Sequence, residues 1–107
     1  MGKKKKRQKT PRNPAAKYEL IADAGTRCML CGRECGRYIT WHHIKPRYAG
    51  GTDSYENASL LCECCHPIIH HYTWGSSEYT YYMEIILHNR ECFLEGNDED
   101  TSFEVPH

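Results

Sequence analysis

A chain of 107 residues with 14 basic and 14 acidic side chains has room for a single small domain. Its neutral formal charge averages two opposite ends, because residues 1–17 hold eight of the lysines and arginines and none of the acids. No apolar run follows the basic start, so we expect neither a signal peptide nor a membrane span and predict a cytoplasmic protein in a reducing compartment.

The charge pattern divides the chain into three parts. Residues 1–13 are predicted to be a disordered basic arm, since a run of lysines without acidic partners cannot bury itself. A folded domain is predicted over residues 14–94, a size that commonly needs disulfides or a metal ion for stability. Residues 95–107 are acidic with few apolar side chains, and we expect them to form a flexible tail.

A helix, a strand and a loop are predicted in the first half of the domain. Asn13 followed by Pro14 is typical of a helix start, and Gly25 of a helix end. The β-branched and aromatic residues 37–43 (RYITWHH) predict a strand, whose adjacent side chains point to opposite faces. The prolines and glycines of residues 45–57 predict a loop.

Two helices are predicted in the second half. Residues 58–61 (ASLL) form a short apolar segment, and a helix that begins near Cys65 would tolerate Pro67 in its first turn. Residues 76–90 favour a second helix, although their tyrosines and isoleucines also suit a strand. These elements together predict a small α+β fold.

Seven cysteines give the strongest chemical signal in the sequence. In a reducing compartment, cysteine pairs bind metal more often than they form disulfides. Two C-x-x-C pairs have the spacing of zinc knuckles and predict one structural four-cysteine Zn²⁺ site, formed by Cys28, Cys31, Cys62 and Cys65. The two-residue spacer leaves three cysteines outside this site, namely Cys35, Cys64 and Cys92.

The histidines predict a second metal site. His66 and His70 lie four residues apart, so on a helix they project from one face and can share an ion. His42 lies on the predicted strand, and the zinc site would fix this strand against the helix, so we expect the three imidazoles to converge. His71 is a rival for His70, but the four-residue spacing favours His70; His88 and His107 are predicted to be surface residues.

The joint pattern of "WHH" at residues 41–43, Pro46, two loop glycines and "ENASLLCECCHPIIH" at residues 56–70 resembles the HNH nuclease family. The resemblance covers residues 28–70 and includes both cysteine pairs. It implies a ββα-metal (HNH) finger stapled by a four-cysteine zinc site, with flanking helices. It also implies a metal-dependent endonuclease that hydrolyses DNA phosphodiester bonds, of a kind found as small standalone proteins in bacteria and bacteriophages.

The resemblance also implies residue roles. His43 corresponds to the general base and Asn57 to the residue that holds the loop and the base in position. His66 and His70 correspond to metal ligands on the helix, and His42 to a further ligand just before the base. The family implies that a backbone carbonyl accepts a hydrogen bond from the other ring nitrogen of the base.

The residue types suit phosphodiester hydrolysis. A neutral imidazole, with a pKa of about 6.5, can take a proton from water at cellular pH. One divalent cation with open coordination positions can contact a phosphate oxygen and the leaving 3′ oxygen together. Imidazole ligands favour Zn²⁺, Ni²⁺, Mn²⁺ or Co²⁺ over Mg²⁺, although the resemblance implies that several ions can serve, magnesium among them.

Contact with DNA is predicted from the basic residues. Lys45 and Arg47 lie beside the strand that carries the base, and the cations of the arm would give salt-sensitive binding without sequence preference. An import signal or a solubility role is the alternative for the arm. The arm residues predicted to bind nucleic acid are Lys3, Lys4, Lys5, Lys6 and Arg7.

A second hypothesis is a non-catalytic zinc module of the same fold. Such a module would bind nucleic acid or a partner protein, such as a bacterial or phage DNA-packaging or restriction component, with its histidines serving structure. The presence of both His43 and Asn57 favours the enzyme.

Overall fold

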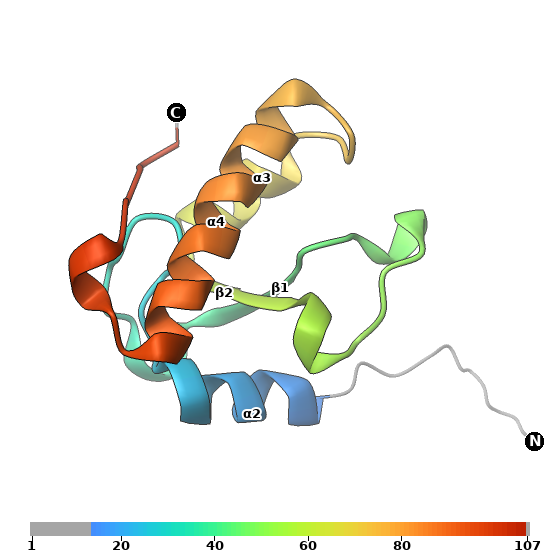
Figure 1. The fold of residues 1–107 in the computed structure, drawn as a ribbon. Coiled ribbons are helices and arrows are strands. Elements are labelled where there is room, and N and C mark those ends of the chain that lie inside the picture. Colours follow the sequence, from blue (N-terminus) through green and yellow to red (C-terminus); the bar gives the residue numbers. More distant parts are fainter. Residues whose placement is uncertain (1–13, 107) are drawn as a thin grey trace, which may run out of the picture.

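The computed structural model describes residues 14–106, and within them the chain forms a small α+β fold, as the sequence predicts. A two-stranded antiparallel sheet lies among the helices α2 (Pro14–Ala24), α3 (Cys65–His70) and α4 (Ser77–Glu95) (Figure 1). The basic arm of residues 1–13, with its predicted DNA-binding lysines, lies outside the described residues, as does His107.

Helix α2 spans Pro14–Ala24 and packs against the second strand and α4. Leu20 is completely buried on its inner face. Gly25 ends the helix, as predicted, because it adopts a φ of 86° and donates its N–H to the Ile21 carbonyl.

The two strands form a long-looped hairpin. Strand β1 (Thr40–His43) pairs with β2 (Ala58–Leu61), so that His42 lies opposite Ser59 and His43 opposite Ala58. β1 begins later than residues 37–43 predicted, because Gly36–Tyr38 form a 3-10 turn (η1). Every residue of β2 is buried, which makes this strand the centre of the core.

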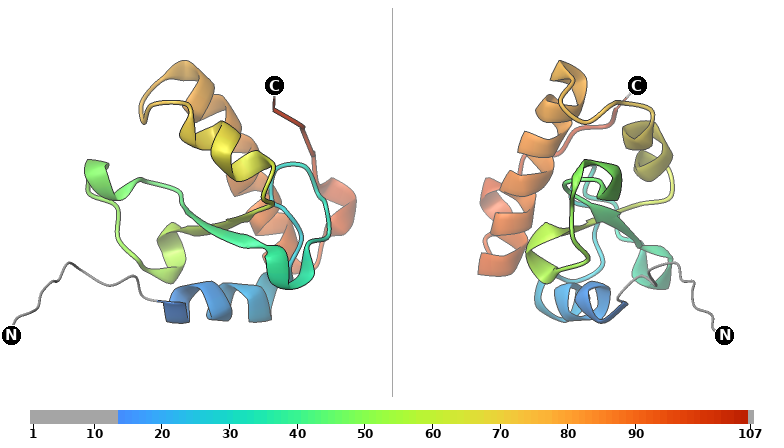
Figure 2. Two further views of the ribbon diagram at one scale, coloured as in Figure 1. Left: turned by 180° about the vertical axis from the view of Figure 1, so that it is seen from behind. Right: turned by 90° about the vertical axis from the view of Figure 1, so that its right-hand side faces the viewer.

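Helices α3 (Cys65–His70) and α4 (Ser77–Glu95) lie to either side of the strands in the right-hand view of Figure 2. The side chain of Ser76 caps α4 by accepting the N–H of Tyr79, and Gly96 ends it with a φ of 69°. The helix predicted for residues 76–90 is therefore confirmed over a longer range. None of the helices within residues 14–106 has the length and apolar character needed to cross a bilayer.

The C-terminal segment, predicted to be a flexible tail over residues 95–107, contacts the domain at Phe103 and Glu104. After the 3-10 turn η4 (Asp98–Asp100), the N–H of Glu104 donates to the carbonyl of Leu30 at 2.7 Å. The Phe103 ring covers Gly32, where an added Cβ would lie 2.7 Å from the ring. The Phe103 side chain packs against the core and fastens the segment to the domain.

Candidate metal centre

Four thiols lie close together where the turn of Cys28–Cys31, the first knuckle, contacts the start of α3. The turn that carries Cys28 and Cys31 is held against β2 by the N–H of Met29, which donates to the Leu60 carbonyl at 2.8 Å. One sulfur from each of the four cysteines of the two C-x-x-C pairs lies within 4.8 Å of the others. The predicted cysteine set is thus brought together by the fold.

The geometry and chemistry of these thiols fit zinc. Ligands about 2.3 Å from a tetrahedral zinc ion lie about 3.8 Å from each other, and the sulfurs of Cys31 and Cys62 are 3.7 Å apart. Backbone N–H groups point at the sulfurs of both knuckles, for example from Leu30 to Cys28 and from Cys65 to Cys62. Such donors favour thiolates, the form that binds metal.

Ionisation within the thiol cluster is uneven. A hydrogen bond from the Cys65 thiol, opposed by burial and assisted by backbone N–H groups, lowers the pKa of Cys28 to about 5. The same hydrogen bond raises the pKa of Cys65, which gives up its donor when it ionises. The cluster therefore already favours a thiolate at Cys28, and it can hold a zinc ion.

The other three cysteines lie outside this cluster, as the spacing predicts. Cys64 is exposed next to Cys65, and its sulfur lies 3.6 Å from the guanidinium of Arg33. Cys35 donates its thiol to the Arg33 carbonyl. Cys92 is buried on α4.

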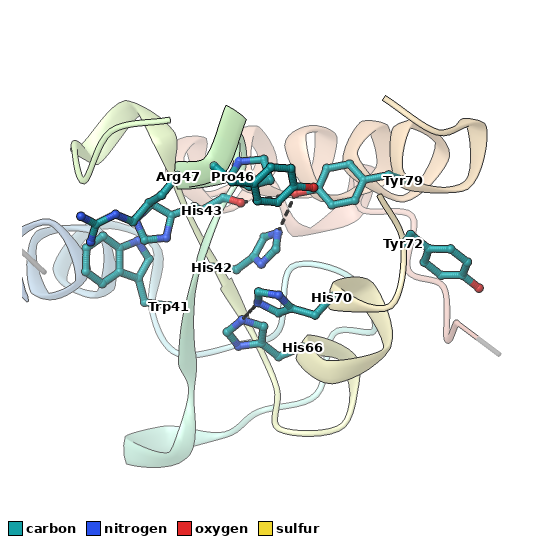
Figure 3. Close-up of a pocket in the computed structure, with 10 residues that line it drawn as sticks. Trp41, His42, His43, Pro46, Arg47, His66, His70, Tyr72 and Tyr79 are labelled. Atoms are coloured by element: carbon teal, nitrogen blue, oxygen red, sulfur yellow. Dashed lines mark hydrogen bonds between the residues drawn. The ribbon is translucent and has the colours of Figure 1, made fainter. Parts of the chain in front are cut away.

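Three imidazoles form a second cluster, as predicted. His42 of β1 and His66 and His70 of α3 each offer a ring nitrogen, and the three nitrogens lie within 4.8 Å of one another. Figure 3 shows the rings of His42, His66 and His70 converging from the two elements. His71, the rival of His70, instead points its ring at Tyr72, with 6.2 Å between the ring centroids.

Burial differs among the three imidazoles. His42 is 3% exposed, whereas His66 is half-buried and His70 is exposed. Burial, with smaller contributions from the neighbouring histidines, lowers the pKa of His42 to about 3, so this ring is neutral at cellular pH. Its Nδ1 atom is buried and has no hydrogen-bond partner within the described structure. An orphaned, neutral ring nitrogen is the donor that a metal ion requires.

A cavity of about 460 Å³ opens over the imidazole cluster. Its aromatic walls include Trp41, Tyr48, Tyr72 and Tyr79, and Arg47 lies at its edge. His43 lines the same cavity as the three clustered imidazoles. A single ligand in this cavity can therefore reach both the cluster and His43.

His43 points away from the imidazole cluster and is held from two sides. Its ring stacks on Trp41, with centroids 4.8 Å apart, and its Nε2 atom lies 2.6 Å from Oδ1 of Asp53. A carboxylate accepts at this contact, so Nε2 carries a proton, and in the neutral ring the lone pair is on Nδ1. The resemblance implied a backbone carbonyl as the partner of this ring, and the structure has a carboxylate instead.

Asn57 fastens the loop that carries Asp53. Its side-chain oxygen accepts the N–H of Lys45 at 2.8 Å, and its amide group donates to the carbonyls of Lys45 and Thr52. The loop closes so tightly that a Cβ on Gly51 would lie 1.7 Å from the Lys45 carbonyl oxygen. Asn57 therefore holds the loop closed through its hydrogen bonds, and Gly51 allows the close backbone contact that this closure requires.

The two loop cations lie differently with respect to the cavity. Arg47 lines it, and its guanidinium lies 3.8 Å from Oδ2 of Asp53. Lys45 is exposed, and its Cε and Nζ atoms lie beside Gly50 rather than in the cavity wall. Both side chains are accessible to a charged ligand.

Sequence reasoning missed the side chains that orient the imidazoles. The sequence places Asp53 only within the predicted loop and gives Thr40 and Tyr79 no role in the site, yet Thr40 contacts His66 at 2.7 Å and Tyr79 contacts His42 at 3.2 Å. A signal for Asp53 was present in its placement in the loop after His43. For the two hydroxyls no local pattern exists, because their partners are 26 and 37 residues away.

The chain forms a small α+β domain with a two-stranded antiparallel sheet and a four-cysteine group compatible with zinc. The family model described as HNH endonuclease matches residues 28–72, a span that contains both cysteine pairs and the three clustered histidines. The resemblance predicted from the sequence is confirmed over this segment. No curated protein matches the chain.

Proposed function

We propose that this protein is a metal-dependent endonuclease that hydrolyses DNA phosphodiester bonds at the cavity over the imidazole cluster. The observation that carries the proposal is that three metal-competent imidazoles and the separately held His43 line one cavity. The HNH match over residues 28–72 supports the reaction class.

His43 acts as the general base in this proposal. Because Nε2–H is donated to Asp53, the lone pair of Nδ1 is available to take a proton from the attacking water. The water oxygen then bonds to phosphorus and the bond to the 3′ oxygen breaks. The departing 3′ oxygen takes a proton from solvent water, which leaves a 5′-phosphate and a 3′-hydroxyl, as the resemblance implies.

His42, His66 and His70 would hold the catalytic divalent cation, Mg²⁺, Mn²⁺, Ni²⁺ or Zn²⁺, through one nitrogen each. When bound, this ion supplies charge stabilisation to the phosphate and to the departing oxygen. The four thiolates would hold a structural Zn²⁺, which would fix the end of β2 and the start of α3 against the turn that carries Cys28 and Cys31. Asn57 keeps the loop of Asp53 closed against β1.

DNA would approach across the loop side of the cavity. Arg47 lies at its edge and Lys45 beside it, both accessible to phosphates. The arm residues predicted to bind DNA would add contacts that weaken as salt is raised.

A plasmid-nicking assay tests the proposal. The zinc-loaded protein, supplied in turn with Mg²⁺, Mn²⁺ and Ni²⁺, is expected to convert supercoiled plasmid to the open circle with at least one of these ions. His43→Ala is expected to lower the rate by about 10²–10⁴-fold, the usual contribution of a general base, while zinc content and thermal unfolding stay as in the parent.

His71→Ala is the matched control, since His71 is an exposed imidazole next to the cluster. It is expected to nick at the parental rate. Equal nicking by the parent and His43→Ala would remove His43 as the base. No nicking with any of the ions would favour the non-catalytic module.

A further inference from the structure

Two hydroxyl groups contact the imidazole cluster on the sides of the rings that face away from its centre. The Tyr79 hydroxyl of α4 lies 3.2 Å from Nε2 of His42, and the Thr40 hydroxyl of β1 lies 2.7 Å from Nδ1 of His66. Figure 3 shows the contact between Tyr79 and His42 above the cluster.

The Tyr79 hydroxyl uses its proton in a hydrogen bond to a backbone carbonyl. The hydroxyl donates to the Ile44 carbonyl at 2.9 Å, and a carbonyl can only accept. Toward His42 the oxygen must therefore accept, so Nε2 of His42 carries the ring proton. The lone pair is left on Nδ1, the buried atom that has no partner within the described structure.

The Thr40 hydroxyl repeats this arrangement on the second ring. It donates to the Leu61 carbonyl at 2.6 Å and must accept from Nδ1–H of His66. The lone pair of His66 is then on Nε2, which lies 2.8 Å from Nε2 of His70. The two rings are thus fixed as opposite tautomers, one with the proton on Nε2 and the other with it on Nδ1.

We propose that Tyr79 and Thr40 are positioning residues that set these tautomers, so that Nδ1 of His42 and Nε2 of His66 face one ion. The inference rests on the metal site in the proposed function and goes beyond it, since it assigns the donor atoms and the groups that select them. A partner on the second nitrogen of a metal-bound imidazole fixes ring orientation and raises ligand basicity.

Metal affinity tests the inference separately from catalysis. The protein is first treated with EDTA until one zinc per chain remains, and Ni²⁺ is then titrated calorimetrically with zinc measured before and after. Tyr79→Phe keeps the ring and removes the hydroxyl, and it is expected to weaken Ni²⁺ binding by about 10–100-fold. Tyr82→Phe is the matched control on the same helix, because its ring packs on Tyr72 rather than on an imidazole, and it is expected to bind as the parent does.

Thr40 gives an independent pair of variants. Thr40→Val, which has the same shape and suits a strand, is expected to weaken Ni²⁺ binding to a similar extent, and Thr40→Ser, which restores a hydroxyl, to recover most of it. Parental affinity in both Tyr79→Phe and Thr40→Val would overturn the inference.

The tautomers can be read in the parent protein without any substitution. Long-range ¹⁵N–¹H correlation spectra of the imidazoles are expected to show the proton on Nε2 of His42 and on Nδ1 of His66 before Ni²⁺ is added. The opposite tautomer at either ring would overturn the inference for that ring, even if a variant failed to fold. Absence of nicking together with these tautomers and affinities would count against the proposed function alone.

Discussion

At the residue scale, Asp53 is the side chain on which the orientation of His43 depends. Its two oxygens are engaged differently, because Oδ1 accepts from His43 and Oδ2 lies 3.8 Å from the Arg47 guanidinium. In Asp53→Asn, the amide oxygen would turn toward Arg47 and the NH₂ group toward Nε2 of His43. The ring proton of His43 would then be on Nδ1, and this nitrogen could no longer accept a proton from water as the proposed general base.

We therefore expect Asp53→Asn to lower the plasmid-nicking rate by an amount that approaches the loss in His43→Ala, about 10²–10⁴-fold. The ¹⁵N spectrum of His43 should show the changed tautomer. Glu56→Gln, an exposed acid in the same loop, serves as the control and is expected to behave as the parent. A parental rate in Asp53→Asn would show that the carboxylate does not orient the base.

At the element scale, the loop between β1 and β2 depends on close backbone contact at Gly51. An alanine there would place its Cβ 1.7 Å from the Lys45 carbonyl oxygen and 2.9 Å from Nδ2 of Asn57, so the loop would have to open. Gly75→Ala is the control, because Gly75 has open space around it and only its φ of 91° resists a side chain.

We expect Gly75→Ala to cost about 1–2 kcal/mol, the usual penalty for a left-handed conformation, and Gly51→Ala to cost more. Urea denaturation measures both. Hydrogen exchange at the Lys45 amide, which donates to Asn57, should be faster only in Gly51→Ala. Equal stability of the two variants would contradict the steric explanation.

The sequence predicted elements where the signal was local. Pro14 and Gly25 mark the ends of α2, the two-residue spacers predict the thiol cluster, and the four-residue spacing predicts that His66 and His70 lie together. The predicted strand starts too early, because the strand propensity of β-branched and aromatic residues does not reveal the 3-10 turn at Gly36–Tyr38. Tyr79 could not be assigned to the site, because its contact with β1 exists only after α4 has docked.

At the scale of the whole molecule, the thiol cluster joins two segments of a domain whose seven cysteines are all free of disulfides. A structural zinc site contributes roughly 10–16 kcal/mol in small zinc domains, as much as the entire stability of a typical domain, about 5–15 kcal/mol. The folded state of this chain is therefore expected to require zinc.

Cys62→Ala is expected to abolish cooperative unfolding in circular dichroism and to lose the bound zinc. Cys64→Ala removes an exposed thiol only two positions away and outside the cluster, so it should keep both. Prolonged treatment of the parent with a strong chelator should reproduce the effect of Cys62→Ala. A cooperative melt in Cys62→Ala would show that the fold does not depend on this site.

One turn of α3 serves both clusters, since Cys65 and His66 are consecutive in the chain and belong to different ligand groups. An inserted residue between them would rotate the following helix by about 100° and shift it by about 1.5 Å. All seven cysteine and histidine side chains of the two clusters would still be present, but His66 and His70 would no longer face His42. The number of residues between the two clusters therefore matters to their relative placement as much as the residue types within them.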